Sequence, residues 1–277
     1  MANIPISREI RLEGGKIGIL MLHGFTGSPE SIKPWAQSLG AHGYTIHVPL
    51  LPGHGTSWQD LNTKRWPEIY QAAEDAFFEM QSKCERVFVA GFSVGGALAL
   101  RLAQLHGSKI EGLLLCNPAL FDDRPISRVL KVAKYFIAST HAGPSDVHRE
   151  NVARTSYARI PLKAWDSVKE LMADVRENLF MVDLPLMVAH SIQDHVIHPE
   201  SSDFIIDNVY SVDIREILFE NSYHNVSLDY DSESLNEESI EFIQDVLSGE
   251  ISRGEGADER ELIDAEFEAI VSGLNLD

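Results

Sequence analysis

The stretch Gly91-Phe92-Ser93-Val94-Gly95 decides how this chain folds and what chemistry it can carry. Residues 86–90 (RVFVA) precede it and predict a short buried strand, because their side chains are mostly apolar and β-branched or aromatic. Residues 96–103 (GALALRLA) follow it and predict a helix. A serine between two glycines at a strand-to-helix turn is typical of a nucleophile elbow. These flanks favour that interpretation over the alternative, an ordinary glycine-rich turn.

The geometry of such a turn explains the glycines. Because the chain reverses sharply at Ser93, the serine must adopt strained backbone angles. A side chain at Gly91 or Gly95 would collide with the neighbouring strand or helix. The turn lifts the Ser93 hydroxyl above the edge of the sheet, where backbone N–H groups at the helix N-terminus can stabilise a developing oxyanion.

Outward from the elbow, apolar runs alternate with helical segments. Continuous apolar runs predict further buried strands at residues 16–22, 44–48, 110–116, 185–190 and 214–219. Helices are predicted at residues 28–40, 65–81 and 232–247, the first of them capped by Ser28 with Pro29 as its first residue. This alternation predicts an α/β fold with a mostly parallel, doubly wound sheet and helices on both faces. Residues 1–15 are expected to lead in as an edge strand or hairpin.

The alternation stops after residue 118, which predicts an insertion. Helix-like segments without a convincing strand are expected at residues 128–138, 146–154 and 162–179. We therefore predict a core at residues 1–118 and 185–248, with a helical cap at residues 119–184 between its two parts.

The remaining segment, residues 249–277, has a linker-like start and an acidic, amphipathic helical end. Its apolar stripe must be buried somewhere. We expect the predicted helix to dock on its own domain, and the alternative is a homo-oligomer formed through it.

Composition excludes several classes of function. The chain has 277 residues and a formal net charge of −19, which disfavours nucleic acid and anionic membranes as partners. Its two cysteines, Cys84 and Cys116, do not indicate a disulfide framework. No apolar run is long enough for a membrane span, and the first residues lack a signal-peptide pattern. We therefore expect a cytoplasmic protein.

An activated serine needs a base and a carboxylate that orients the base. In a fold of this kind the order along the chain is nucleophile, acid, histidine. Asp194 follows the strand at residues 185–190, and His224 follows the last strand. The rival acids Asp183 and Asp203 are expected in solvated helix or loop positions, and most of the other histidines lie before Ser93, in the insertion or around Asp194. The candidate catalytic residues are therefore Ser93, Asp194 and His224.

An oxyanion hole needs two backbone N–H donors. One should come from Val94, the residue after the nucleophile, and the other from the loop after the strand at residues 16–22. Phe25 is the candidate there, because Gly24 and Gly27 allow the backbone to turn toward the site. His23 is expected to tie loops together beneath the site.

Five motifs together resemble an α/β-hydrolase, and more narrowly the small bacterial carboxylesterase and monoacylglycerol lipase group. The resemblance covers about residues 16–247, and its motifs are residues 23–27 (HGFTG), 52–55 (PGHG), 91–95 (GFSVG), 194–197 (DHVI) and 222–224 (SYH). It implies the same catalytic and oxyanion residues, and it implies a short helical cap at the position of residues 119–184.

We therefore predict a serine hydrolase that cleaves a medium-chain ester or a monoacylglycerol through an acyl-enzyme, with no cofactor or metal. Aryl esters of the feruloyl type, thioesters and amides fit the same three residues, and a non-catalytic binding protein is the alternative outside enzymes. Apolar side chains of the predicted cap are expected either to form its core or to line an acyl tunnel: Phe121, Ile126, Val129, Leu130, Val132, Tyr135, Phe136 and Ile137.

Overall fold

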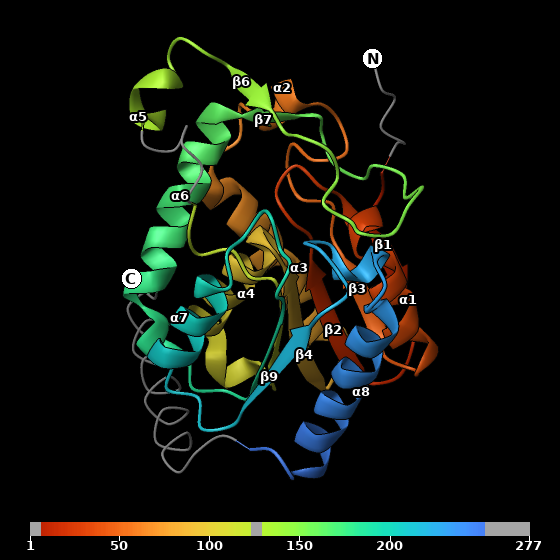
Figure 1. The fold of residues 1–277 in the computed structure, drawn as a ribbon. Helices are drawn as coiled ribbons and strands as arrows, with labels where there is room; N and C mark the ends of the chain where they lie inside the picture. The colour runs from red at the N-terminus through yellow and green to blue at the C-terminus, as the bar shows by residue number, and fades with distance from the viewer. Residues whose placement is uncertain (1–6, 123–128, 253–277) are drawn as a thin grey trace, which may run out of the picture.

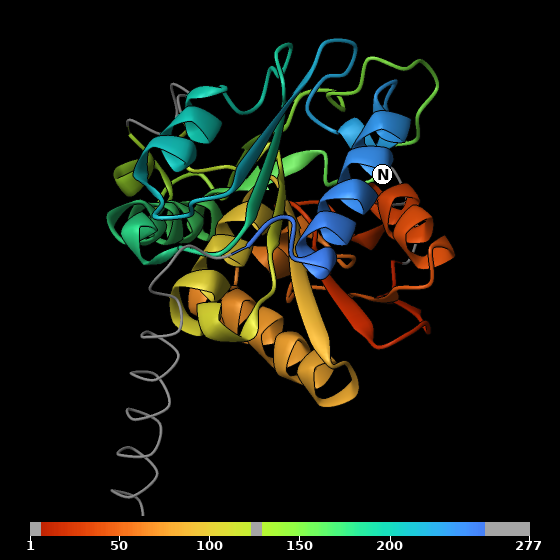
Figure 2. The same cartoon turned by 90° about the horizontal axis from the view of Figure 1, so that it is seen from below.

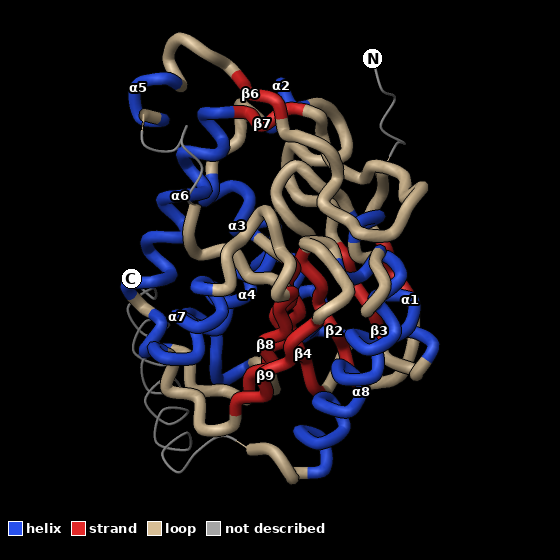
Figure 3. Tube along the Cα trace, in the orientation of Figure 1, coloured by secondary structure: helices blue, strands red, loops and turns tan. Residues whose placement is uncertain are grey.

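The computed structural model describes residues 7–122 and 129–252, and a seven-stranded sheet runs through its centre (Figure 1, Figure 3). The strand order is β1-β3-β2-β4-β5-β8-β9, and only β1 runs antiparallel to its neighbour. The strands are β1 (Ile10–Leu12), β2 (Ile17–Leu22), β3 (Thr45–Val48), β4 (Arg86–Phe92), β5 (Leu113–Cys116), β8 (Leu186–Ser191) and β9 (Ile214–Phe219). The predicted mostly parallel sheet is confirmed.

Helices cover both faces of this sheet, as Figure 2 shows. On one face lie α1 (Lys33–Ala41) and α8 (Ser232–Ser248), and on the other lie α3 (Trp66–Lys83), α4 (Val94–His106), α6 (Leu162–Glu177) and α7 (Glu200–Asn208). A short α2 (Trp58–Leu61) precedes α3, and 3₁₀ turns occur at Pro29–Ser31, Gly107–Lys109, Leu179–Met181 and Val226–Leu228.

Strand β4 shows why both faces must be covered. Val87 and Val89 pack into the apolar cluster beneath α3 and α4, whereas Phe88 and Ala90 pack into the cluster beneath α1 and α8. Successive strand side chains point to opposite faces, so a strand that is apolar throughout residues 87–90 needs a helix layer on each side.

The register of the sheet determines where the functional loops meet. Leu22 of β2 lies opposite Gly91 of β4, and Phe92 lies opposite Cys116 of β5. Farther along, Ser191 of β8 lies opposite Phe219 of β9. The loops that follow these strands therefore leave the sheet at one edge, the carboxyl edge at which α/β folds place their ligands.

The segment between β5 and β8 differs from its prediction. It contains α5 (Leu130–Ala133), which is shorter than expected, and a two-stranded antiparallel ribbon of β6 (Ser139–His141) and β7 (Arg159–Pro161), where no strand was expected. Helix α6 agrees with the prediction for residues 162–179 to within two residues. Its Leu171 and Val175 belong to the core cluster under α4, while Leu162 and Trp165 face a separate cluster beside Ser93.

The helix predicted at residues 146–154 is absent from the structure. The backbone N–H groups of His148 and Arg149 donate instead to the Asp229 carboxylate, over 2.6 and 2.9 Å. Asn151 has a φ of 62°, which a helix does not allow. Tertiary contacts thus override the local helical pattern.

Ser28 does not cap a helix through its side chain, because a 3₁₀ turn at Pro29–Ser31 separates it from α1. Helix α7 had no counterpart in the sequence prediction.

The amphipathic helix predicted within residues 249–277 lies outside the described residues, as does Ile126 of the cap. None of the helices within residues 7–122 and 129–252 has the length and apolarity needed to cross a membrane.

Candidate active site

Ser93 lies at the junction of β4 and α4 in a conformation that L-residues rarely adopt, with φ 56° and ψ −120°. Close backbone contacts require glycine on both sides of this turn, at Gly91 and Gly95. A Cβ atom on Gly95 would lie 2.0 Å from the carbonyl oxygen of Leu22, and one on Gly91 would lie 2.4 Å from the carbonyl oxygen of Gly95. The predicted elbow geometry is therefore present, and its glycines cannot carry side chains without a backbone shift.

The structure brings the three candidate catalytic residues together. His224 Nε2 lies 3.1 Å from Ser93 Oγ, and His224 Nδ1 lies 2.7 Å from Asp194 Oδ2. The Asp194 side chain is 1% exposed and that of His224 12% exposed. A proton on Nδ1 is held by the carboxylate, which leaves Nε2 free to accept the serine proton.

Asp194 is fixed by its own loop. Its Oδ1 accepts hydrogen bonds from the backbone N–H groups of Val196 and Ile197, over 2.7 and 2.8 Å. The other oxygen is thereby left for His224. Both carboxylate oxygens have defined partners, which fixes the plane of the carboxylate and hence the orientation of the imidazole.

Asn117 connects the loops that carry the acid and the histidine. Its side-chain N–H donates to the His224 carbonyl oxygen over 2.6 Å, and its Oδ1 accepts from Ser191 N–H over 2.8 Å. The residue is 2% exposed and has a φ of 44°, which asparagine tolerates better than most residues. No local sequence pattern indicates this role for Asn117, because its partners are distant in the chain.

Asp146 makes a second connection, this time from the insertion. Its Oδ2 accepts from the backbone N–H groups of His195 and His224, over 3.1 and 3.2 Å. Its Oδ1 lies 2.9 Å from His195 Nδ1, and its carbonyl oxygen accepts from Asn225 N–H over 3.2 Å. One residue of the insertion therefore holds both the loop of Asp194 and the loop of His224. No local motif marks it in the sequence.

Asp229 anchors the loop of His224 and the adjacent part of the insertion. It is fully buried, and its carboxylate accepts backbone N–H groups from His148, Arg149, Tyr223 and Tyr230. A buried carboxylate with this many donors is well compensated for the loss of water. The loop of His224 and the adjacent part of the insertion therefore share one anchor.

The predicted oxyanion donors flank Ser93. Thr26 has a φ of 61°, and Gly27 N–H donates to the Gly24 carbonyl oxygen over 3.1 Å, so the loop after β2 turns tightly beside the serine. Within the described parts of the chain, the backbone N–H groups of Phe25 and Val94 have no hydrogen-bond partner. Both residues line the cavity in front of Ser93.

His23 and His54 lie beneath this loop. His23 Nδ1 donates to the Gly24 carbonyl oxygen over 3.1 Å, and Nε2 accepts from Leu51 N–H over 3.3 Å. Burial lowers the pKa of His23 to about 3 and the pKa of His54 to about 4. The rings lie 4.9 Å apart and are neutral at pH 7. His23 thus ties two loops together, as expected.

A cavity of about 370 Å³ opens in front of Ser93 and His224. Its apolar lining includes Phe25, Val94, Ile160, Trp165, Ile197 and Leu228. Eight apolar cap residues were expected either to form the core of the cap or to line an acyl tunnel, and none of the seven that the structure describes lines this cavity. Tyr135 and Phe136 are instead 71% and 84% exposed, and Phe121 packs against the core cluster. The cap contributes Ile160 of β7 and Trp165 of α6 to the lining, positions that the sequence analysis did not single out.

Ser93 has strained backbone angles, and its hydroxyl lies within hydrogen-bonding distance of a histidine that in turn contacts a buried carboxylate. This arrangement, at the carboxyl edge of a mostly parallel sheet, defines a serine hydrolase of the α/β-hydrolase fold. The chain belongs to the family described as "Serine aminopeptidase, S33", whose profile matches residues 16–231.

Known relatives agree with this placement. A thermostable monoacylglycerol lipase of Bacillus sp. (strain H-257) is 31% identical over 230 residues, or 83% of this chain and 91% of that protein. A carboxylesterase of Bacillus subtilis (strain 168) is 26% identical over 241 residues, or 86% of this chain and 96% of that protein. A solved structure of a metagenome-derived lipolytic enzyme has a TM-score of 0.84 and 29% identity, over 87% of this chain and 98% of that chain. The predicted resemblance and the prediction of a serine ester hydrolase are confirmed at this level.

Proposed function

We propose that this enzyme hydrolyses medium-chain carboxylic esters, monoacylglycerols among them, through an acyl-enzyme formed on Ser93. The observation that carries the proposal is the hydrogen-bonded series from Ser93 through His224 to Asp194, at the end of a cavity that has both apolar and polar walls. Ester hydrolysis by an activated serine needs these three groups and a place for the acyl chain.

In the first step, His224 Nε2 takes the proton of Ser93 as the serine oxygen attacks the ester carbonyl carbon. Asp194 stabilises the imidazolium that forms and keeps Nδ1 protonated. The tetrahedral intermediate then collapses, and the alcohol leaves with the proton from His224. In the second step a water molecule attacks the acyl-enzyme with His224 again as base, and the carboxylic acid is released.

Phe25 and Val94 supply the two N–H groups that bind the oxyanion. Both N–H groups lie beside the serine and lack a protein acceptor within the described residues. Val94 also begins α4, so its N–H is one of the helix N-terminal donors that have no acceptor within the helix. Donors aimed at the developing charge contribute about 2.7–4 kcal/mol each to lowering the barrier.

The apolar walls of the cavity support a substrate with an apolar chain. Its volume of about 370 Å³ lies near the lower end of the range of small-molecule sites, which suits a medium acyl chain better than a long one. The rings of Phe25 and Trp165 lie 5.0 Å apart and form one apolar wall. The names of the bacterial relatives, a monoacylglycerol lipase and a carboxylesterase, favour the same substrate class.

The family description, which names an aminopeptidase, favours one second candidate, hydrolysis of peptide or other amide bonds. An aminopeptidase needs a carboxylate for the free amino group of its substrate. Asp122 and Asp146 line the cavity, but Asp122 accepts from Trp165 Nε1 and Asp146 accepts from two backbone N–H groups. Because both acids already have protein partners, the ester substrate is favoured.

A substrate panel tests the proposal. Esters of increasing acyl length, a monoacylglycerol, an aryl ester, a thioester and an aminoacyl amide would be offered to the native enzyme and to Ser93→Ala. We expect kcat/KM to peak at medium acyl length and turnover to vanish in Ser93→Ala. A peak on the amide, or equal rates along the acyl series, would contradict the proposed substrate class.

A further inference from the structure

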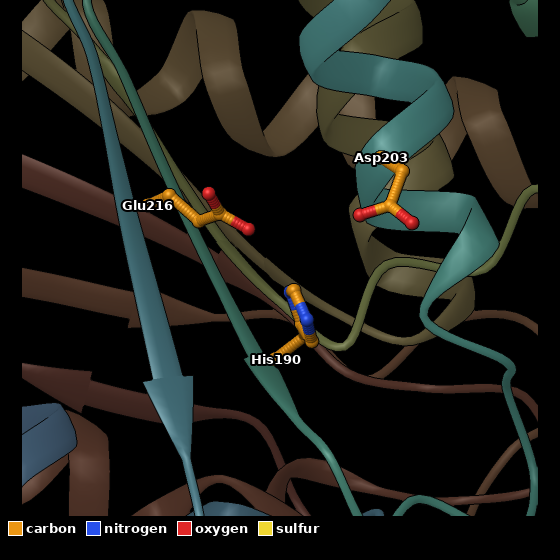
Figure 4. A group of neighbouring side chains, drawn as sticks. All are labelled: His190, Asp203 and Glu216. Carbon is orange, nitrogen blue, oxygen red and sulfur yellow. The ribbon is translucent and has the colours of Figure 1, made fainter.

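A second group of side chains with potential metal-ligand atoms lies in another part of the sheet. It consists of His190 on β8, Asp203 on α7 and Glu216 on β9 (Figure 4). Each offers one nitrogen or oxygen atom, and these three atoms lie within 4.8 Å of one another. None of the three is used in the mechanism above.

The fold brings them together through the register of two parallel strands. Val188 of β8 lies opposite Glu216, and His190 lies opposite Leu218. Side chains two residues apart share one face of a strand, so His190 and Glu216 both face the layer of α7. Asp203 lies on α7, which packs on the core through its fully buried Ile205. The three ligands therefore come from three elements that pack side by side.

His190 is the unusual member of this group. The residue is 6% exposed, and within the described parts of the chain its Nδ1 is buried without a hydrogen-bond partner. Its ring points into the space between the two carboxylates (Figure 4). A buried polar atom without a partner is costly, and an explanation is needed for its presence. Burial lowers the pKa of His190, so the imidazole is neutral at pH 7, which is the form that binds metals.

The two carboxylates complete a ligand set. Asp203 and Glu216 are exposed, and within residues 7–122 and 129–252 neither forms an ion pair with a lysine or arginine. One imidazole and two carboxylates are typical protein ligands of a divalent transition metal. The exposed side of the group gives a metal ion a path from solvent and leaves a position for a water ligand.

We propose that His190, Asp203 and Glu216 bind a divalent transition metal ion such as Zn²⁺, and that the ion links β8, α7 and β9. Tetrahedral coordination at bonds of about 2.0–2.2 Å requires ligand atoms about 3.4 Å apart. The exposed carboxylates reach that spacing by rotation of their side chains. The ion stabilises the packing of α7 on the strand that leads to Asp194, and it takes no part in ester hydrolysis.

Zn²⁺ binding to the full-length, metal-free enzyme tests this site. The double variant Asp203→Asn/Glu216→Gln removes two ligands at exposed positions, so we expect it to fold. The control Asp207→Asn/Glu220→Gln removes equal charge from exposed positions on α7 and just after β9. Equilibrium dialysis would count bound Zn²⁺, and thermal unfolding would measure its effect.

We expect the native enzyme and the control to bind one more Zn²⁺ than the double variant. At a hundredfold excess over Kd, Zn²⁺ should raise their Tm by on the order of 5 °C, and it should leave the Tm of the double variant nearly unchanged. His190→Asn should also lose Zn²⁺ binding. If that variant does not fold, the comparison of the native enzyme with Asp203→Asn/Glu216→Gln still tests the site. Equal Zn²⁺ binding and equal Tm shifts in all variants, or no bound Zn²⁺ in the native enzyme, would overturn the proposal.

Discussion

The Asp146 carboxylate accepts a hydrogen bond from the backbone N–H of His224 over 3.2 Å, although the two residues lie 78 positions apart in the chain. The same oxygen also accepts from His195 N–H, in the loop of Asp194. A residue of the insertion over the sheet therefore positions both partners of Ser93. The insertion does more than cover the cavity, because it sets the relative placement of the acid and the histidine.

This relationship predicts a loss of activity in Asp146→Ala. Without the carboxylate, two backbone N–H groups lose their acceptor and the His224 loop can shift. A misplacement of about 1 Å can cost about 100-fold in rate, so we expect kcat on a short ester to fall by up to that factor. KM should change little, because the apolar lining is retained. Asp146→Asn keeps an acceptor oxygen and should retain most of the activity. Equal kcat in the native enzyme and Asp146→Ala would show that Asp146 does not position the triad.

The contact between Gly95 and Leu22 predicts that Gly95→Ala disrupts the elbow. The new Cβ atom would lie 2.0 Å from a backbone oxygen, so β2 or α4 must move. We expect a loss of several kcal/mol in the free energy of unfolding and no measurable ester hydrolysis. Gly107→Ala is the matched control, because its Cβ atom would have no neighbour closer than 3.7 Å. Denaturant unfolding of both variants checks the prediction, which is contradicted if they are equally stable.

The buried histidines predict how stability depends on pH. In the unfolded chain a histidine titrates near pH 6.5, whereas burial lowers the pKa of His54 to about 4 in the folded protein. Between these values the unfolded state binds more protons. The stabilisation is therefore complete above pH 6.5 and is lost as the pH falls toward 4. His54 alone should lower the free energy of unfolding by about 2 kcal/mol between pH 8 and pH 5.

His54→Asn tests this linkage. The asparagine amide can replace Nδ1–H as donor to the Pro52 carbonyl oxygen, and it does not titrate. The difference in unfolding free energy between pH 8 and pH 5 should be smaller in the variant than in the native enzyme. An unchanged difference would mean that His54 does not carry the expected proton linkage.

The cavity lining predicts a change in chain-length preference. Ile160 lies on β7 and faces the cavity, so Ile160→Phe adds volume to one wall. We expect kcat/KM for the longest accepted acyl chain to fall at least tenfold while kcat/KM for a short ester stays within about twofold. Phe136→Ala is a suitable comparison, because Phe136 is 84% exposed and does not line the cavity. A uniform loss over all chain lengths in Ile160→Phe would indicate general disruption of the site.

Much of the core could be predicted from the sequence, because its signals are local. The apolar runs of β2, β4, β5 and β8 and the glycine pattern around Ser93 each reflect one element and its burial. Asp194 and His224 could be selected because parallel strands end at one edge of the sheet. Their loops therefore had to meet near the elbow, whatever the details of packing.

The insertion could not be predicted in the same way. Its path depends on contacts between distant residues, such as the backbone of His148 and Arg149 with the Asp229 carboxylate. For the same reason the roles of Asp146 and Asn117 could not be predicted, since each residue contacts loops that are distant in the chain. The apolar side chains of Val132, Tyr135 and Phe136, in and just after α5, are exposed and line no wall of the cavity, because hydrophobicity alone does not indicate where a side chain will lie.

The most direct test of the central claim is to identify the residue that an ester-like inhibitor modifies. The enzyme would be treated with an alkyl fluorophosphonate, which phosphonylates an activated serine, and the adduct would be located by mass spectrometry. We expect one adduct per chain, on Ser93, with activity lost in proportion. Ser93→Ala should remain unmodified and inactive. An adduct on another residue, or full ester hydrolysis by Ser93→Ala, would contradict the account.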